Sequence, residues 1–185
     1  MPILKFRAYF EEDEAVYRDV AIRHTQTFRE LFEAIVKSYE FDNKHQATFF
    51  RSNDQWQRGR EISLAIYNKD YQVAPLLMDE TAIGSEIRNP NQRFILVYDF
   101  NRNWVFLIEL INVSKEENPK LTYPAVTRIE GIPPSQYGTK GLLGEKFAEI
   151  EEKYDLSGAE EGFGEKDEEG EDVGFGEDSL GEEEI

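Results

Sequence analysis

The chain has 185 residues, no cysteine and a formal net charge of -17 at pH 7. The absence of cysteine excludes disulfides, thiolate zinc sites, cysteine nucleophiles and iron–sulfur clusters. The charge is uneven, because 14 of the 38 acidic residues lie between 155 and 185, together with a single lysine. We therefore predict one globular domain over residues 1–154, followed by an acidic Gly/Glu-rich tail over residues 155–185 that is disordered.

The beginning of the chain, MPILKFRAYFEEDE, does not resemble a secretory signal. It lacks the apolar core of about 7–15 residues that such signals contain. No apolar run approaches the roughly 18 residues that a membrane-spanning helix needs. We therefore expect a cytoplasmic protein that has no membrane segment.

The first part of the domain has the pattern of a hairpin followed by a helix. Residues 3–10 alternate apolar and polar side chains, and residues 15–23 form a second run of the same kind after an acidic loop. Thr27 and Glu30 then have the spacing of a capping box, which begins a helix. The apolar residues of this helix recur at helical spacing and are predicted to pack on the hairpin: Phe28, Leu31, Phe32, Ile35, Val36 and Tyr39.

Further strands are predicted at residues 47–51 and 56–62, with a turn at residues 52–55. Residues 64–90 are interrupted by Pro75 and Gly84, and TAIGSEI is expected to form a single helical turn.

The hairpin at residues 93–111 is expected to lie at the centre of the sheet. Both of its strands are apolar on both faces, which is typical of strands that are covered on both sides. Its turn falls at Asn101 to Asn103, since asparagine tolerates a left-handed backbone.

After this hairpin, residues 121–138 contain Pro124, Pro133 and Pro134. Because proline interrupts regular structure, we expect an ordered strap across the domain rather than a strand or helix. A short helix is predicted at residues 145–154. The fold class is therefore α+β, with a mainly antiparallel sheet and one helix packed after an N-terminal hairpin, in a β-grasp-like arrangement.

Three separated segments resemble the motifs of one known family. YDFNRNW (residues 98–104) is similar to the family's YDFGDGWEH, and YPAVTRIEGIPPSQYG (residues 123–138) to its YPxCxxGExxCPPEDCGG. FDNKHQATFF (residues 41–50) is similar to its WDxSHLHxF. The family is named for the third open reading frame of a root-inducing plasmid, and some members are described as TnpR-like transposon passenger proteins. The resemblance covers residues 3–140 and implies a compact α+β fold, but it implies little about activity.

The chain departs from the family motifs at several polar positions. Arg102 stands where the family has its second acid, and Phe106 where it has histidine. Val126, Ile132 and Tyr137 stand where the family often has cysteine. A metal or acid–base site built from those groups would lose most of its members, whereas a packing role of the strap is expected to survive.

Few residues have the chemistry of an active site. His45 and Asp99, together with Glu109, form the basis of an enzyme hypothesis if the three converge. The structural alternatives are that His45 stabilises a helix-to-strand junction, and that Asp99 caps the hairpin turn or pairs with Arg102 or Arg93. No nucleotide-binding or hydrolase motif is present. We therefore expect no catalytic residue, no metal site and no cofactor.

Nucleic-acid binding would require a basic face that neutralises phosphates. A set of arginines and tryptophans would form one patch if the two hairpins that carry them are neighbours: Arg51, Arg58, Arg60, Arg93, Arg102, Trp56 and Trp104. The overall negative charge opposes such a role.

Three functional hypotheses remain from the sequence. The first is a non-catalytic bacterial binding or adaptor module whose partner is a protein, basic if it engages the acidic tail. Its candidate binding residues are Asp99, Trp104, Trp56, His45, Arg58, Arg60 and Arg102. The second is a mobile-element-associated nucleic-acid-binding accessory protein, and the third is a hydrolytic enzyme.

Overall fold

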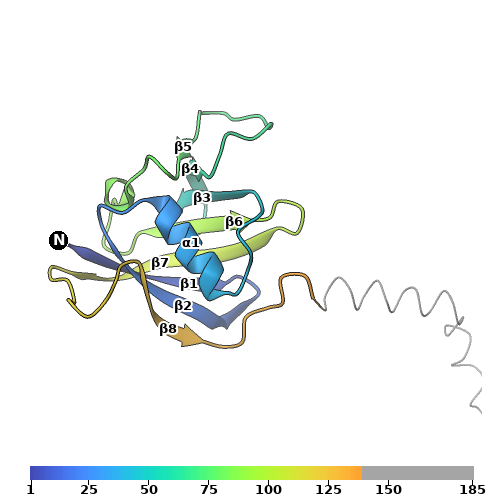
Figure 1. Ribbon diagram of the computed structural model, residues 1–185. Helices are drawn as coiled ribbons and strands as arrows, with labels where there is room; N and C mark the ends of the chain where they lie inside the picture. Colours follow the sequence, from blue (N-terminus) through green and yellow to red (C-terminus); the bar gives the residue numbers. More distant parts are fainter. Residues whose placement is uncertain (139–185) are drawn as a thin grey trace, which may run out of the picture. The chain divides into compact units, whose positions relative to one another are not determined.

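The computed structural model describes residues 1–138, which form one sheet of eight strands, one α-helix and one short 3-10 helix (Figure 1). In chain order the elements are β1 (Ile3–Phe10), β2 (Asp13–Arg23), α1 (Phe28–Ser38), β3 (Ala47–Ser52), β4 (Arg58–Ser63), β5 (Leu76–Leu77), η1 (Ile83–Glu86), β6 (Arg93–Tyr98), β7 (Trp104–Ser114) and β8 (Ala125–Glu130).

The strands are ordered β5-β4-β3-β6-β7-β1-β2-β8 across the sheet. All neighbouring strands are antiparallel except β4 and β5, which pair in parallel over two residues each. The long ladder between β1 and β7 joins the N-terminal hairpin to the β6–β7 hairpin, so β6 and β7 lie inside the sheet. The predicted α+β class, its antiparallel sheet and its N-terminal hairpin are confirmed.

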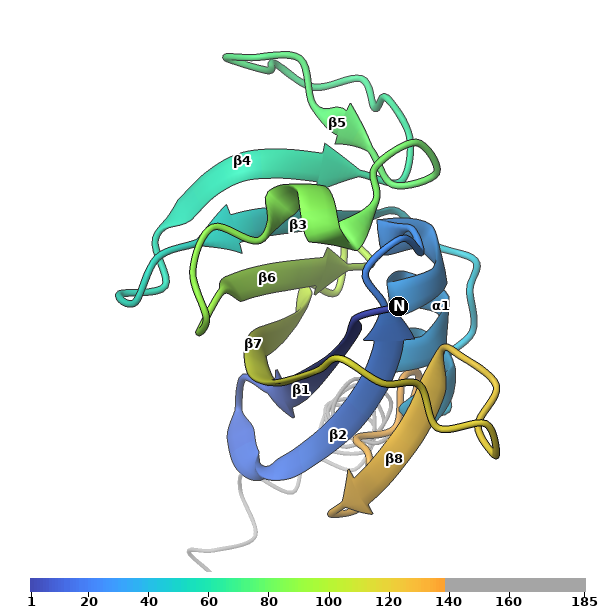
Figure 2. The same ribbon diagram turned by 90° about the vertical axis from the view of Figure 1, so that its left-hand side faces the viewer.

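Helix α1 covers one face of the sheet, which curls around it in Figure 2. The capping box is present, because the Thr27 hydroxyl accepts from the Glu30 amide while the Glu30 carboxylate accepts from the Thr27 amide. The helix buries the apolar stripe that its spacing predicted. Aromatic side chains form much of the core between helix and sheet, with Phe28 in contact with both Phe49 and Phe94 at 5.2 Å between ring centroids.

The opposite face of the sheet carries a second, smaller apolar cluster. Its buried members are Ile95, Val97 and Val105, with Phe50, Trp56, Phe100 and Leu107 packed around them. β6 is therefore apolar on both faces, as predicted. Within residues 1–138 no helix lies on this face, and the cover comes from side chains such as Trp56. Trp56 belongs to the β3–β4 turn, where its φ is +56°, and not to the strand predicted from residue 56.

The prediction that residues 121–138 hold no regular element is wrong. Strand β8 lies between Pro124 and Pro133 and pairs with β2 at the edge of the sheet. Proline lacks an amide donor, but an edge strand needs donors on only one side, and the six residues of β8 contain no proline. The helix predicted at residues 145–154 and the tail at residues 155–185 lie outside the described residues, so the domain boundary stays a prediction.

None of the helices formed by residues 1–138 combines the length and the apolar character that crossing a membrane requires.

Candidate functional site

A polar cluster forms where three segments distant in sequence meet. The cluster, which we call the clasp, consists of Asp42, His45, Tyr98, Asp99 and Gln136. Asp42 and His45 lie in the loop between α1 and β3, Tyr98 and Asp99 at the end of β6, and Gln136 after β8. The clasp therefore joins the loop after the helix to the central hairpin and to the strap.

Asp99 supports the turn of the β6–β7 hairpin. Its φ is +55°, and its carboxylate Oδ1 accepts from the amides of Asn101 (3.2 Å) and Arg102 (3.4 Å). These contacts match the structural alternative in which Asp99 caps the turn. Arg93 does not pair with Asp99, because its guanidinium lies 3.3 Å from the Glu109 carboxylate. The Arg102 guanidinium instead donates to the carbonyl of Gln136 at 3.3 Å.

Gln136 holds the strap to Asp42 through two hydrogen bonds. The Asp42 amide donates to Gln136 Oε1 at 2.6 Å, and Gln136 Nε2 donates to Asp42 Oδ1 at 2.9 Å. The Tyr98 hydroxyl also reaches Asp42 Oδ1 at 2.8 Å and accepts from the Lys44 amide. Burial raises the pKa of the Tyr98 hydroxyl, and its hydrogen bond with Asp42 acts in the same direction. Tyr98 therefore stays a neutral donor at physiological pH.

His45 lies between two carboxylates. Its Nδ1 is 3.7 Å from Asp99 Oδ2 and its Nε2 is 3.7 Å from Asp42 Oδ1, while about 31% of its side chain is exposed. His45 and Asp99 thus lie together, as the enzyme hypothesis required. Glu109 does not join them. It pairs with Arg93 at the other end of the β6–β7 ladder from Tyr98, so the convergence of all three groups on which the enzyme hypothesis rested does not occur.

The described residues contain no group of three or more His, Cys, Asp or Glu side chains arranged to hold a metal ion.

Trp104 is part of the aromatic core and not of a basic surface. Its ring lies 5.0 Å from that of Phe41 and 5.8 Å from that of Phe10. Its Nε1 is buried and has no hydrogen-bond partner within residues 1–138. The residue therefore packs between the α1–β3 loop and the β1 end.

The arginines and tryptophans that were considered as one basic patch are divided between different parts of the sheet, so they do not form a single patch. Arg51 is opposite Phe94, on the helix-covered face, and its guanidinium is 2.5 Å from Glu86. Arg93 lies on the other face, with its guanidinium carbon 4.7 Å from the Trp56 ring centroid. Arg102 belongs to the turn at the far end of β6. One-residue alternation along β3 and β6 accounts for this division.

Three arginines are among the residues that line a hollow of about 380 Å³ beside the β3–β4 turn. We call it the arginine hollow. Its lining includes Arg88, which sequence reasoning missed, because the residue lies in the loop before β6 and only the fold brings that loop to β3. The lining residues are Arg51, Ser52, Asn53, Gln57, Arg58, Gly59, Arg88, Asn89 and Gln92. Arg60 lines a neighbouring hollow with Arg58 and Tyr71.

A larger groove, of about 550 Å³, runs between α1 and β8. We call it the α1–β8 groove. It was not foreseen, because β8 itself was not. Its lining combines apolar side chains with three glutamates and one lysine: Glu30, Glu33, Ala34, Lys37, Ser38, Glu40, Pro124, Val126 and Ile129.

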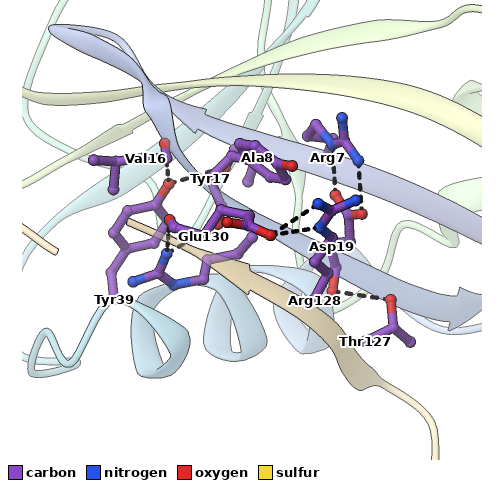
Figure 3. Close-up of polar contacts among 10 residues, drawn as sticks. Arg7, Ala8, Val16, Tyr17, Asp19, Tyr39, Thr127, Arg128 and Glu130 are labelled. Carbon is purple, nitrogen blue, oxygen red and sulfur yellow. Dashed lines mark hydrogen bonds and ion pairs between the residues drawn. The ribbon is translucent and has the colours of Figure 1, made fainter. Parts of the chain in front are cut away.

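Strand β8 forms one wall of this groove and is paired with another strand, β2, along one edge only. Figure 3 shows Thr127 donating to the carbonyl of Asp19 on β2, at 3.4 Å, and Arg128 bonded to Glu130 along β8. The opposite edge of β8 pairs with no strand in the described part of the chain.

A family model described as "Plasmid pRiA4b ORF-3-like protein" matches residues 8–154. The chain belongs to this family. The segments that resemble the family's motifs are the ones that meet at the clasp, since residues 41–50 supply Asp42 and His45 and residues 98–104 supply Tyr98 and Asp99.

One solved structure similar to this member of the plasmid pRiA4b ORF-3-like family is that of the protein of unknown function MM3350 from Methanosarcina mazei Go1. The two share 15% sequence identity with a TM-score of 0.64, and the match covers 84% of each chain. At this identity the likeness supports the fold alone. No curated protein matches the chain.

The positions where this chain departs from the family motifs have different structural roles. Phe106 is fully buried and packs against Tyr39 in a tilted arrangement, with 4.6 Å between ring centroids. Val126 and Ile132 are 40% and 88% exposed, so the expectation that the apolar replacements preserve packing of the strap fails for these two residues.

Proposed function

We propose that the protein is a non-catalytic binding module that takes an extended, basic segment of a partner protein along β8 and into the α1–β8 groove. The observation that supports this most directly is the exposure of Ile129, which is 63% accessible on an edge strand beside an apolar groove. The carboxylates of the clasp are already engaged in holding the turn and the strap, which leaves the groove as the better candidate for function.

The open edge of β8 favours a partner in extended conformation. Unpaired edge amides and carbonyls form a template for another strand, and strand addition of this kind is a common mode of peptide recognition. Pro124 and Pro133 flank the six residues of β8 and limit the length of the added strand. A partner segment of similar length is therefore expected.

The rim of the groove favours lysine or arginine in the partner. Glu33 is 2.6 Å from Arg29 on its own helix, and Glu40 makes no ion pair with another described residue. Lys37 is the single cation among the lining residues against Glu30, Glu33 and Glu40. The acidic composition of residues 155–185 adds long-range attraction for a basic partner.

The sequence preference of the partner can be determined by phage display, in which random nine-residue peptides are selected for binding to the full chain. Enriched peptides are expected to alternate apolar with basic residues. Ile129→Ser should weaken their binding at least tenfold, because it removes the apolar contact, and Glu33→Gln with Glu40→Gln should weaken it in a salt-dependent way.

Two matched variants separate the groove from general surface effects. Ile132→Ser removes an exposed apolar side chain outside the groove, and Glu116→Gln removes an exposed carboxylate outside it. Neither should change binding. Selection of acidic peptides, or equal binding by Ile129→Ser and the wild type, would contradict the proposal.

A further inference from the structure

We propose that the protein associates into a two-fold symmetric dimer in which the outer edge of β8 pairs with β8 of a second copy. This pairing occupies the edge that a partner segment uses, so the dimer is the closed form of the binding site and the monomer is the open form. The pairing itself is independent of the proposed function, and only its effect on partner binding rests on that function.

The two edges of the sheet differ in their capacity to add a strand. Strand β5, at one edge, is two residues long, whereas β8, at the other edge, is six residues long. Within residues 1–138, β8 pairs only with β2, along its inner edge. Because unpaired edge amides and carbonyls form a template for another strand, β8 is the edge at which the sheet can be extended.

The geometry of antiparallel pairing limits how two copies of β8 can align. Two residues lie opposite each other only if both direct their backbone polar groups toward the other strand, or both away from it. Since this direction alternates along a strand, identical edges can align only with one residue opposite its own copy. Residues 128–130 form the regular part of β8, because its register against β2 shifts between Val126 and Arg128. Within this part, the residue on the two-fold axis is Arg128, Ile129 or Glu130.

The charges of these residues select one alignment. With Arg128 or Glu130 on the axis, like charges would lie directly opposite each other, which destabilises a strand pair. With Ile129 on the axis, each Arg128 lies opposite Glu130 of the second copy. Arg128 and Glu130 are 2.8 Å apart along their own strand, and their side chains are 53% and 43% exposed, so both are accessible to a second copy.

Both faces of β8 gain contacts in this alignment. Arg128 lies on the face of Tyr17, with its guanidinium carbon 5.7 Å from the ring centroid (Figure 3), whereas Ile129 lines the α1–β8 groove. Ile129 is 63% exposed and meets its own copy across the axis. The paired strands therefore cover two apolar side chains on one face and form two pairs of opposite charge on the other. A two-fold contact uses the same surface on both copies, so association stops at the dimer.

Sedimentation velocity of the full chain tests the pairing, in roughly 0.15 M salt to screen the repulsion between chains of net charge -17. The wild type is expected to shift from monomer to dimer as its concentration rises. Arg128→Glu leaves two carboxylates on the paired face and Glu130→Arg leaves two guanidinium groups, so each variant alone should associate at least about tenfold more weakly. An equal mixture of the two variants should form dimers again, as should the double variant, because opposite charges then face each other.

Arg88→Glu is the matched control, since it makes the same change of charge at an exposed position in the loop before β6, and β6 is four strands away from β8. It should dimerise as the wild type does. The pairing is overturned if the wild type stays monomeric up to about 0.5 mM, if the two single variants dimerise like the wild type, or if their mixture stays monomeric.

A peptide selected for the groove separates the pairing from its effect on partner binding. The peptide should dissociate the wild-type dimer, because both use the outer edge of β8. A bound peptide that leaves the dimer intact would overturn the competition between them. A dimer that forms and responds to the charge variants, in a protein that selects no peptide, would overturn the proposed function and leave the pairing established.

Discussion

Arg18 brings a positive charge into the interior at a place where it forms no ion pair with any carboxylate of residues 1–138. The residue is 1% exposed, and its guanidinium donates to the carbonyls of Ser38, Tyr17 and Glu130 at 3.0, 2.9 and 2.7 Å. Ser38 is the last residue of α1, so the charge lies at the negative end of the helix dipole. One side chain thus connects the end of the helix to β2 and β8.

Replacing Arg18 tests this connection. Arg18→Met keeps much of the side-chain volume but leaves buried carbonyls without a donor, each at a cost of about 1–3 kcal/mol. We expect the free energy of unfolding to fall by roughly 3 kcal/mol in urea denaturation. Arg128→Met, on an exposed position of β8, should cost less than about 0.5 kcal/mol. Equal effects of the two variants would show that the hydrogen bonds from Arg18 to the backbone carbonyls contribute nothing to the free energy of unfolding.

Burial of Tyr39 makes the stability of the folded protein depend on pH in the alkaline range. Its hydroxyl is buried against the carbonyls of Ala8 and Val16, at 2.9 and 3.2 Å (Figure 3), and burial raises its pKa well above the ordinary value. Above a pH of about 10 the unfolded tyrosine loses its proton while the folded one keeps it. The folded state then binds more protons, so the stability contributed by Tyr39 is present below pH 10 and is lost as the pH rises.

Tyr39→Phe removes this titration. Between pH 10 and 12 the free energy of unfolding of the wild type should fall more steeply than that of the variant, by up to about 1.4 kcal/mol per pH unit. Denaturant titrations at several pH values measure both slopes. Identical slopes would mean that Tyr39 does not titrate differently in the two states.

At the scale of elements, the sequence correctly predicted the helix and the hairpins whose formation depends on residues close together in the chain. The capping box of Thr27 and Glu30 and the apolar stripe of α1 are both present as predicted, because helix spacing and caps involve residues within four positions. The β6–β7 hairpin was predicted for the same reason, from two apolar runs and an asparagine-rich turn.

Strand β8 was missed because its formation depends on β2, which is about a hundred residues earlier in the chain. Its sequence, AVTRIE, is short and lies between prolines, so local rules favoured a loop. In the fold, β2 offers an unpaired edge, and Arg18 adds side-chain hydrogen bonds to the carbonyls of Glu130 and Gly131. The groove proposed for partner binding exists only because this pairing forms.

At the scale of the whole molecule, Gln136 ties the strap to a loop 94 residues earlier in sequence. Gln136→Ala removes the acceptor of the Asp42 amide and one donor to its carboxylate, for a loss of roughly 1–3 kcal/mol in the free energy of unfolding. Amide hydrogen exchange at Asp42 should accelerate, because its N–H loses its partner. Ser135→Ala, at an exposed neighbour, should change neither quantity. Unchanged exchange at Asp42 in the Gln136 variant would contradict this role.

The sequence by itself determined the α+β class, the helix, the main hairpins and the family, because each depends on local periodicity or on short motifs. It also identified His45 and Asp99, which the fold does bring together. The sequence left open whether Glu109 joins them and whether the arginines share one patch, and in the fold neither happens.

Only the tertiary structure decided the order of the strands, the pairing of β8 and the assembly of the arginine hollow. In a strand, a shift of one residue moves a side chain to the other face, so alternation alone does not settle which residues meet. Gln92 ties the loop that carries Arg88 to the carbonyl of Ser52 at the end of β3, 40 residues earlier in the chain. Such contacts join residues far apart in the chain, and their energies depend on the whole sheet and not on any short stretch of sequence.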